Sequence, residues 1–378
     1  MGSGIILLPS LLYDIVNNYS LFIWIIISVL GLAFAFIFGK LAVLYPGASG
    51  VSSATKSALG KKYQLLTSFY LIFAVFFGPV AVVLIGADFL KEYFINTNTA
   101  FLAFILYFVT YLMLLLKIDF LGKIMLVITS VITIIFLFSS INILLNLNEF
   151  HFILPIFNLK DIGYSFLLAF WAIVGWEVIG NYSSEVKSKS TITNAVLFSA
   201  LTVTLVYILL ASAIVFGNFE QNLNENFKLI WIIEPLLGSF SKIILVLMSV
   251  LLCMGTLVLF VGGVARLISS LNLSTYSSRR LKTGSPYGAL NLLGLVHIIV
   301  LYLVYIEFFT KANLVALADG FFIANAIIGL ITAIKIFENS ILKVFAYILL
   351  VIFFIILLFS NIYILFAILA LFLYTYNK

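Results

Sequence analysis

The chain has 378 residues, of which 64 % are hydrophobic and only 9 % are charged, and its mean hydropathy is +1.27. A soluble domain carries about 25 % charged residues, so this composition excludes a soluble globular protein. The net charge of +6 is spread over short connections rather than gathered into one basic patch, which argues against a nucleic-acid partner. Apolar runs of about 20 residues recur along the chain and predict an integral membrane protein of transmembrane helices in a lipid bilayer.

Twelve apolar segments follow one another along the chain, and the first is short. They cover residues 4–17, 21–44, 64–90, 99–116, 122–145, 162–182, 192–216, 239–268, 288–308, 313–336, 340–358 and 361–376. Most connections between them are short, and the longest lie at 146–161, 217–238 and 269–287. The pattern therefore predicts an all-α fold of about twelve transmembrane segments without a soluble domain.

Lys and Arg residues predict the orientation of these segments. With the N-terminus in the cytoplasm, the inward connections hold fifteen of the 20 basic residues: Lys40, Lys56, Lys61, Lys62, Lys117, Lys123, Lys187, Lys189, Arg266, Arg279, Arg280, Lys282, Lys335, Lys343 and Lys378. The outward side holds the other five: Lys91, Lys160, Lys228, Lys242 and Lys311. This bias predicts that both termini are cytoplasmic.

Residues that could hold a metal or carry out catalysis are few. The chain has one cysteine, Cys253, and two histidines, and neither an Asp cluster nor a His cluster accompanies them. We therefore expect no metal site, no cofactor and no enzyme activity.

Two segments are interrupted where a helix would be expected to continue. Gly2-Ser3-Gly4 interrupts the first segment, and Val174-Gly175-Trp176-Glu177 interrupts the sixth. Each opens a set of five segments, and an odd number of spans places the second set in the opposite orientation. Paired interruptions in two inverted halves indicate the substrate site of a transporter. Taken alone, Gly-Ser-Gly also fits a simple close packing of helices.

Unwound backbone at such a site offers both kinds of hydrogen-bonding group. Freed amides at a helix N-terminus bind anions, whereas freed carbonyls bind a cation or an ammonium group. Two facing interruptions therefore suit a zwitterion such as an amino acid.

Short motifs along the whole chain resemble the amino acid–polyamine–organocation transporter superfamily. In order they are Met1-Gly2-Ser3-Gly4-Ile5 through Leu8-Pro9, Tyr45-Pro46-Gly47-Ala48-Ser49-Gly50, Gly78-Pro79-Val80-Ala81 through Ile85-Gly86, Phe170-Trp171, Gly175-Trp176-Glu177 and Ser184-Glu185-Val186-Lys187. The overall pattern is most similar to bacterial exporters of methionine and branched-chain amino acids, and less similar to the arginine–agmatine antiporter.

This resemblance implies a five-plus-five inverted repeat of the leucine-transporter type, with residues 1–145 and 146–337 as the repeats and 338–378 as two additional helices. It places the substrate carboxylate on amides near Gly2, Ser3 and Gly4, and the substrate amine on carbonyls of Trp171 and Val174, where Gly175 lets the backbone turn. A further carbonyl would precede Met1. We therefore expect helix 1 to be truncated at its N-terminus, by a misassigned start or a shortened gene.

Departures from the arginine antiporter imply an apolar side-chain pocket. The third segment has Pro79 where the antiporter supplies an asparagine, and an ungapped alignment puts Leu257 where a tryptophan stacks on the substrate guanidinium. With Gly78, these two residues are expected to contact the substrate. Apolar walls favour a neutral aliphatic or thioether side chain by about 0.8 kcal/mol per buried methylene.

Ionisable residues inside the spans are candidates for ion coupling. Glu177 and Asp319 could each take up a proton during transport, although Glu177 also fits a strut that stabilises the interruption, and Asp319 also fits an acid bonded to nearby backbone. His297 fits either a proton relay or a bond to a neighbouring helix. The coupling ion, with the proton as one candidate, stays open.

The sequence thus predicts a secondary active transporter that exports or exchanges neutral hydrophobic amino acids by alternating access in the bacterial cytoplasmic membrane. A transporter-like protein that binds or senses amino acids without moving them is the alternative. A homodimer is compatible with either function.

Overall fold

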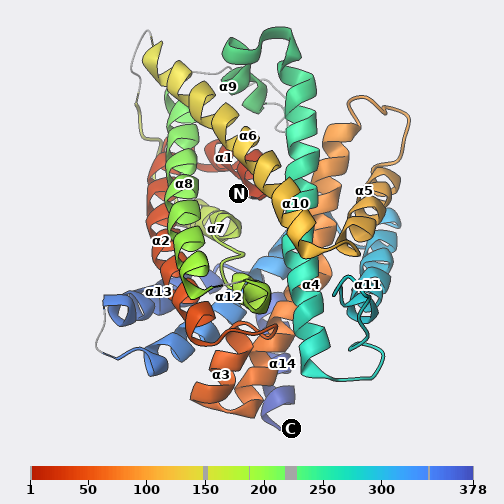
Figure 1. Ribbon diagram of the computed structural model, residues 1–378. Helices are drawn as coiled ribbons and strands as arrows, with labels where there is room; N and C mark the ends of the chain where they lie inside the picture. Colours follow the sequence, from red (N-terminus) through yellow and green to blue (C-terminus); the bar gives the residue numbers. More distant parts are fainter. Residues whose placement is uncertain (1, 148–151, 187, 218–227, 339–340, 378) are drawn as a thin grey trace.

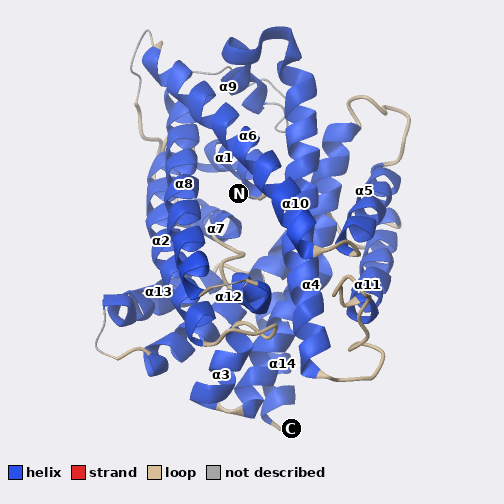
Figure 2. Cartoon of the chain, viewed as in Figure 1, coloured by secondary structure: helices blue, strands red, loops and turns tan. Residues whose placement is uncertain are grey.

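The structure is a computed structural model that describes residues 2–147, 152–186, 188–217, 228–338 and 341–377. Within these ranges the regular structure is helical throughout (Figure 2). In chain order the helices are α1 (Gly4–Val16), α2 (Tyr19–Leu44), α3 (Val51–Leu59), α4 (Lys61–Leu90), α5 (Thr99–Leu114), α6 (Ile118–Leu145), α7 (Leu159–Ala169), η1 (Phe170–Ala172), η2 (Ile179–Glu185), α8 (Lys189–Phe216), α9 (Lys228–Leu237), η4 (Gly238–Phe240), α10 (Ser241–Leu271), α11 (Tyr287–Tyr305), α12 (Lys311–Ile336), α13 (Ile341–Leu357) and α14 (Ile362–Tyr376).

The twelve expected segments are all present. Seven stretches of the described chain are long and apolar enough to cross a membrane: α2, α4, α6, α8, residues Leu229–Leu271 including α10, α11 and α12. The shorter apolar helices α1, α5, α13 and α14 and the interrupted segment formed by α7, η1 and η2 complete the set. The prediction of an all-α integral membrane protein is therefore confirmed.

Two helices, α3 and α9, are not predicted by the pattern of apolar segments. α3 is rich in serine, threonine and alanine, and α9 lies in the long connection at 217–238. Both are too short for the 20-residue apolar criterion. Their stability comes from packing: Leu229, Ile232 and Ile233 of α9 are buried at helical spacing, and Thr55 of α3 hydrogen-bonds Thr332 of α12.

α4 occupies the centre of the bundle. It packs against α12, α10, α5, α3, α14 and α11, and its residues from Leu66 to Phe89 are mostly buried. α1 begins near mid-height of the long upright helices in Figure 1, at the level of the interrupted sixth segment. The two interruptions therefore lie inside the bundle rather than at its ends.

The sixth segment breaks where the sequence indicated. α7 ends at Ala169, one turn of 3-10 helix follows, and the chain turns at Gly175, whose φ of +118° lies in a region that favours glycine. The segment resumes as η2, a 3-10 helix of seven residues. Its second half is therefore a tight and short helix, which depends on its neighbours for support.

The connection after α2 supports η2. The Gly47 amide donates to the Ser183 hydroxyl over 2.9 Å, and the turn continues through Gly50, whose φ is +52°. A Cβ added to Gly180 would lie 2.8 Å from the Gly50 Cα. The glycines of the 45–50 motif and of η2 therefore allow two backbones to touch.

Replacing Gly180 with alanine tests this contact. Because backbone atoms block the new methyl group, we expect the Gly180→Ala variant to be less stable by roughly 1–3 kcal/mol, measured as a lower midpoint of thermal unfolding in detergent. The matched control is Gly122→Ala in α6, where an added Cβ meets no atom within 4 Å and alanine favours the helix. Equal midpoints for the two variants would contradict the close approach.

Candidate functional site

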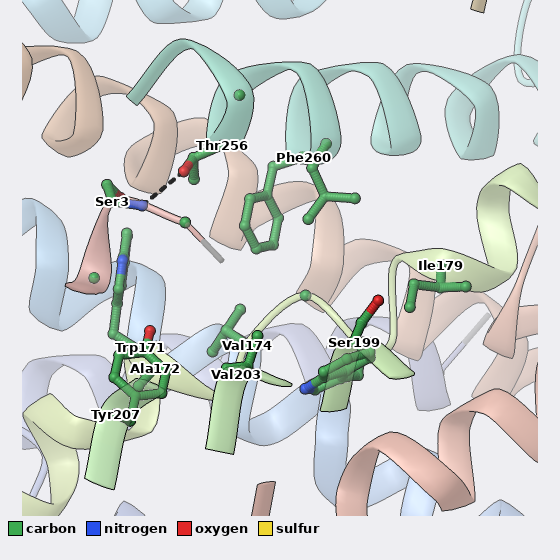
Figure 3. Close-up of a pocket in the computed structure, with 16 residues that line it drawn as sticks. Ser3, Trp171, Ala172, Val174, Ile179, Ser199, Val203, Tyr207, Thr256 and Phe260 are labelled. Carbon is green, nitrogen blue, oxygen red and sulfur yellow. Dashed lines mark hydrogen bonds between the residues drawn. The ribbon is translucent and has the colours of Figure 1, made fainter. Parts of the chain in front are cut away.

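A cavity of about 230 Å³ lies between the start of α1, the interruption of the sixth segment, α8 and α10 (Figure 3). It is lined by Gly2, Ser3, Gly4, Trp171, Ala172, Val174, Gly175, Trp176, Ile179, Ser199, Val203, Tyr207, Gly255, Thr256, Leu259 and Phe260. None of these sixteen described residues carries a charged side chain. The polar groups that face the cavity are therefore backbone groups, hydroxyls and indole N–H groups.

The start of α1 meets α10 at one end of the cavity. The Ser3 amide donates to the Thr256 hydroxyl oxygen over 2.9 Å, which is the dashed bond in Figure 3, and the Thr256 hydroxyl in turn donates to the Leu252 carbonyl over 2.8 Å. A Cβ on Gly2 would lie 3.0 Å from the Thr256 oxygen. Glycine at position 2 thus lets α1 approach α10 closely.

Helical geometry leaves the first amides of α1 without carbonyl partners inside their own helix. The first N–H groups of a helix have no carbonyl partner within that helix, and they carry the positive end of its dipole. Ser3 and Gly4 stand at this end of α1. The site can therefore offer backbone donors to an anion.

The interruption of the sixth segment forms the opposite wall. Gly175 turns the backbone, and its amide donates to Oε2 of the buried Glu177 over 2.9 Å. Within the described chain, the other carboxylate oxygen of Glu177 has no hydrogen-bond partner. The contact fits the strut reading of Glu177, and this residue does not itself line the cavity.

Aromatic rings hold the cavity walls in place. Trp24 of α2 stacks on Tyr207 with ring centroids 4.7 Å apart, and a Cβ on Gly4 would lie 3.1 Å from Trp171 Cδ1. Phe260 and Phe322 lie 5.1 Å apart between α10 and α12. The walls are thus built from large side chains packed against a second layer.

Six of the site residues expected from the sequence meet at this cavity, namely Gly2, Ser3, Gly4, Trp171, Val174 and Gly175. Gly78 and Pro79 do not line it. A Cβ on Gly78 would lie 3.4 Å from Trp171 Cη2, so this part of α4 backs the tryptophan instead. Whether these residues bind substrate stays a prediction.

The expected position of Leu257 on the pocket wall is not found. The cavity face of α10 carries Gly255, Thr256, Leu259 and Phe260, and one residue advances a helix by about 100°, so Leu257 points away from it. It is fully buried elsewhere in the core. Because α10 is apolar on all sides, the sequence holds no signal that would have identified Thr256, Leu259 and Phe260.

Pro79 takes part in a hydrogen-bonded link between helices. Proline has no N–H, so the carbonyl four residues earlier, on Val75, loses its donor within α4. His297 of α11 supplies a replacement, with Nε2 2.6 Å from the Val75 oxygen. Since a carbonyl only accepts, Nε2 carries the proton and Nδ1 accepts from the Tyr107 hydroxyl at 2.8 Å. These contacts fit the expectation that His297 hydrogen-bonds a neighbouring helix.

Asp319 lies in α12 away from the cavity. It is completely buried, and within the described residues neither carboxylate oxygen has a hydrogen-bond partner. The expected bond to nearby backbone is therefore not found. A buried acid without partners is costly when ionised, which keeps Asp319 as a candidate for binding a proton.

A charged cluster ties η2 to α10 beyond the cavity. The Arg266 guanidinium forms a two-point ion pair with Glu185 and lies 4.6 Å above the Tyr182 ring. The Tyr182 hydroxyl donates to the carbonyls of Val258 and Leu259. These contacts fix the second half of the sixth segment against α10.

Comparison with known proteins decides the family. A family model described as amino acid permease matches residues 1–377. The chain belongs to the amino acid permease family. This assignment confirms the resemblance to the amino acid–polyamine–organocation superfamily and identifies the permease as a multi-pass membrane transporter of that fold. The family and its structural neighbours are transporters rather than enzymes.

Solved structures of a manganese transporter from Eremococcus coleocola share the permease fold. A variant with histidine replaced by alanine is 14 % identical, has a TM-score of 0.66, and covers 100 % of this chain and 91 % of its own. The same transporter in complex with an aromatic bis-isothiourea substituted compound is 12 % identical with a TM-score of 0.62 and the same coverage. At this identity the likeness shows the fold alone. No curated protein matches the permease in a sequence search.

A double-mutant cycle tests the link between Pro79 and His297. The His297→Phe variant leaves the buried Val75 carbonyl without a donor, so we expect a loss of roughly 1–3 kcal/mol in stability. In the Pro79→Ala background a backbone N–H is restored four residues after Val75, and the same substitution should cost less. Unfolding in denaturant measures the four proteins. An identical cost in both backgrounds would show that His297 acts independently of the proline.

Proposed function

We propose that this permease is a secondary active transporter of neutral, hydrophobic amino acids, and that the cavity between α1 and the interrupted sixth segment is its substrate site. The observation that carries the proposal is the meeting of two interrupted backbones around a cavity without charged side chains. A zwitterion presents one charge to each interruption, and its neutral side chain meets the apolar walls.

The carboxylate is assigned to the start of α1. The amides of Ser3 and Gly4 stand at the positive end of that helix, which favours an anion. The Ser3 amide donates to Thr256 in the structure. A carboxylate that accepts from Ser3 must therefore take this amide from Thr256, so substrate binding loosens the contact between α1 and α10.

The amine is assigned to the interruption of the sixth segment. Where a helix is interrupted, carbonyls lose their partners, and both Trp171 and Val174 are among the residues that line the cavity. Glu177 does not line the cavity among the described residues. The ammonium group therefore meets backbone carbonyls rather than a carboxylate.

The side chain is assigned to the space beside Val203, Leu259 and Phe260. A guanidinium or ammonium group there would lose its hydration without a charged partner. A hard divalent cation such as Mn²⁺ prefers carboxylate, carbonyl and water oxygens, and no carboxylate lines this cavity among the described residues. The lining therefore supports an apolar side chain over a cationic one or a metal ion.

The resemblance to bacterial exporters extends the proposal. Residues 1–145 and 146–337 are the two inverted repeats, both termini face the cytoplasm, and the permease exports or exchanges its substrate across the bacterial cytoplasmic membrane by alternating access. Asp319 is the stronger candidate for proton coupling because its buried carboxyl lacks partners in the described chain, whereas Glu177 supports the interruption.

Flux measurements in proteoliposomes test the substrate class. We expect labelled leucine and methionine to cross the membrane, each competing with the other, while labelled arginine does not. Protein-free vesicles are the control. Transport of arginine without leucine or methionine would contradict the apolar pocket. Binding of leucine without flux would instead favour the amino-acid sensor.

Thr256 variants test the carboxylate assignment. Thr256→Val keeps the shape of the side chain and removes the acceptor for the Ser3 amide, so we expect leucine to bind about two- to tenfold more tightly, which is the effect of one hydrogen bond. Thr256→Ser keeps the hydroxyl and should bind like the wild type. Equilibrium binding in detergent measures both. Weaker binding by Thr256→Val would show that the hydroxyl contacts the substrate instead.

A further inference from the structure

A second cavity of about 510 Å³ lies apart from the substrate cavity and shares no residue with it. Its walls come from α3, α4, α12, α13 and α14, and are almost entirely apolar. The lining residues are Leu59, Tyr63, Leu66, Tyr70, Ala324, Ile327, Ile328, Ile331, Lys335, Phe354, Leu357, Ile368 and Phe372. The proposed substrate does not account for this space.

The cavity is a slot that runs along the helices. On α12 its wall is the stripe Ala324, Ile328, Ile331 and Lys335, with the spacing of one helix face. The ends of this stripe are eleven positions apart, which is about 16 Å along a helix. Because the long helices cross the membrane, the slot has the direction of a lipid acyl chain.

Contacts between the helices show which helix ends lie together at each end of the slot. Thr67 of α4 donates to Asn325 of α12 over 2.6 Å, and Thr55 of α3 pairs with Thr332 at 3.0 Å. Further along α4, a Cβ on Gly78 would lie 3.4 Å from the Cβ of Ala318, which comes earlier in α12 than Asn325. α4 and α12 therefore run in opposite directions here, so the start of α4 and the end of α12 lie at one end of the slot.

Positive charge gathers at that same end. Lys335 is the one charged residue among the described residues of the slot wall, and its side chain is exposed. Lys61 and Lys62 begin α4, where the Lys62 ammonium donates to the Tyr376 carbonyl over 2.7 Å, and Lys56 follows Thr55 on α3. Deeper in the slot, the Tyr70 hydroxyl donates to the Ile368 carbonyl over 2.9 Å. Its donor is therefore already used at that end.

We propose that this slot binds one acyl chain of an acidic phospholipid, with its phosphate against Lys335. The apolar stripe contacts the acyl chain, and the lysines at the membrane surface attract the negative headgroup. A zwitterionic lipid brings a cation beside its phosphate, which the lysines at this end disfavour, and a second copy of the permease offers no acyl chain. The site would brace α4 against α12, the helices whose Gly78 and Phe322 back Trp171.

Native mass spectrometry of the purified full chain tests the proposal. The protein is titrated with phosphatidylglycerol and with phosphatidylcholine of identical acyl chains, and we expect tighter binding of phosphatidylglycerol. Lys335→Gln should weaken phosphatidylglycerol about fivefold, which corresponds to about 1 kcal/mol for one lysine near an anionic lipid. Ile331→Trp, which fills the slot, should remove binding of both lipids.

Two matched controls lie outside the slot, and thermal unfolding confirms that each variant is folded. Lys123→Gln removes an exposed lysine of α6, and Ile298→Trp enlarges an exposed side chain of α11; both should bind lipid like the wild type. Equal binding of the two lipids, or equal loss in Lys335→Gln and Lys123→Gln, would overturn the headgroup assignment. Unchanged binding in folded Ile331→Trp, or a dimer that this variant dissociates, would overturn the slot as a lipid site. These readouts do not depend on amino-acid transport.

Discussion

Backbone that leaves its helix inside a membrane must find hydrogen-bond partners within the protein, because lipid offers none. This requirement organises the core of the permease. The Ser3 amide finds Thr256, the Gly175 amide finds Glu177, and the Val75 carbonyl freed by Pro79 finds His297. Each of the three partners is a buried polar side chain in an otherwise apolar chain. Residues that suggest ion coupling, such as Glu177 and His297, thus act first as hydrogen-bond partners of irregular backbone.

The second half of the sixth segment shows the same dependence on a larger scale. η2 is only seven residues of 3-10 helix, too short to be stable alone. Tyr182 and the Glu185–Arg266 pair fasten it to α10, while Ser183 fastens it to the connection after α2. A partly buried ion pair of this kind brings geometric definition more than net stability. Any movement of η2 during transport must break contacts on both of its sides together, which favours two discrete positions over a continuous range.

Much of this architecture follows from the sequence, and the exceptions have physical reasons. Long apolar runs and the glycines at positions 2, 4 and 175 identified the spans and the interruptions, because bilayer thickness and backbone freedom are local constraints. The helices α3 and α9 were missed since their stability comes from tertiary packing. Leu257 is not among the residues that line the cavity, and a uniformly apolar helix does not reveal its rotation. The bond between His297 and Val75 joins residues 222 positions apart, and no local pattern encodes such a pairing.

Trp171 shows that residues outside the cavity help to determine its dimensions. One edge of the indole lies against Gly4 of α1, and the opposite edge lies against Gly78 of α4. The ring therefore works as a spacer of fixed width between the two helices, seated on a bare backbone at each end. A methyl group at position 78 would only reach van der Waals contact with the ring, 3.4 Å from Cη2. A larger side chain there would press the ring toward α1 and narrow the cavity without altering any residue that lines it. Related permeases can thus adjust cavity size through a residue in the second layer, where a comparison of lining residues alone would find no difference.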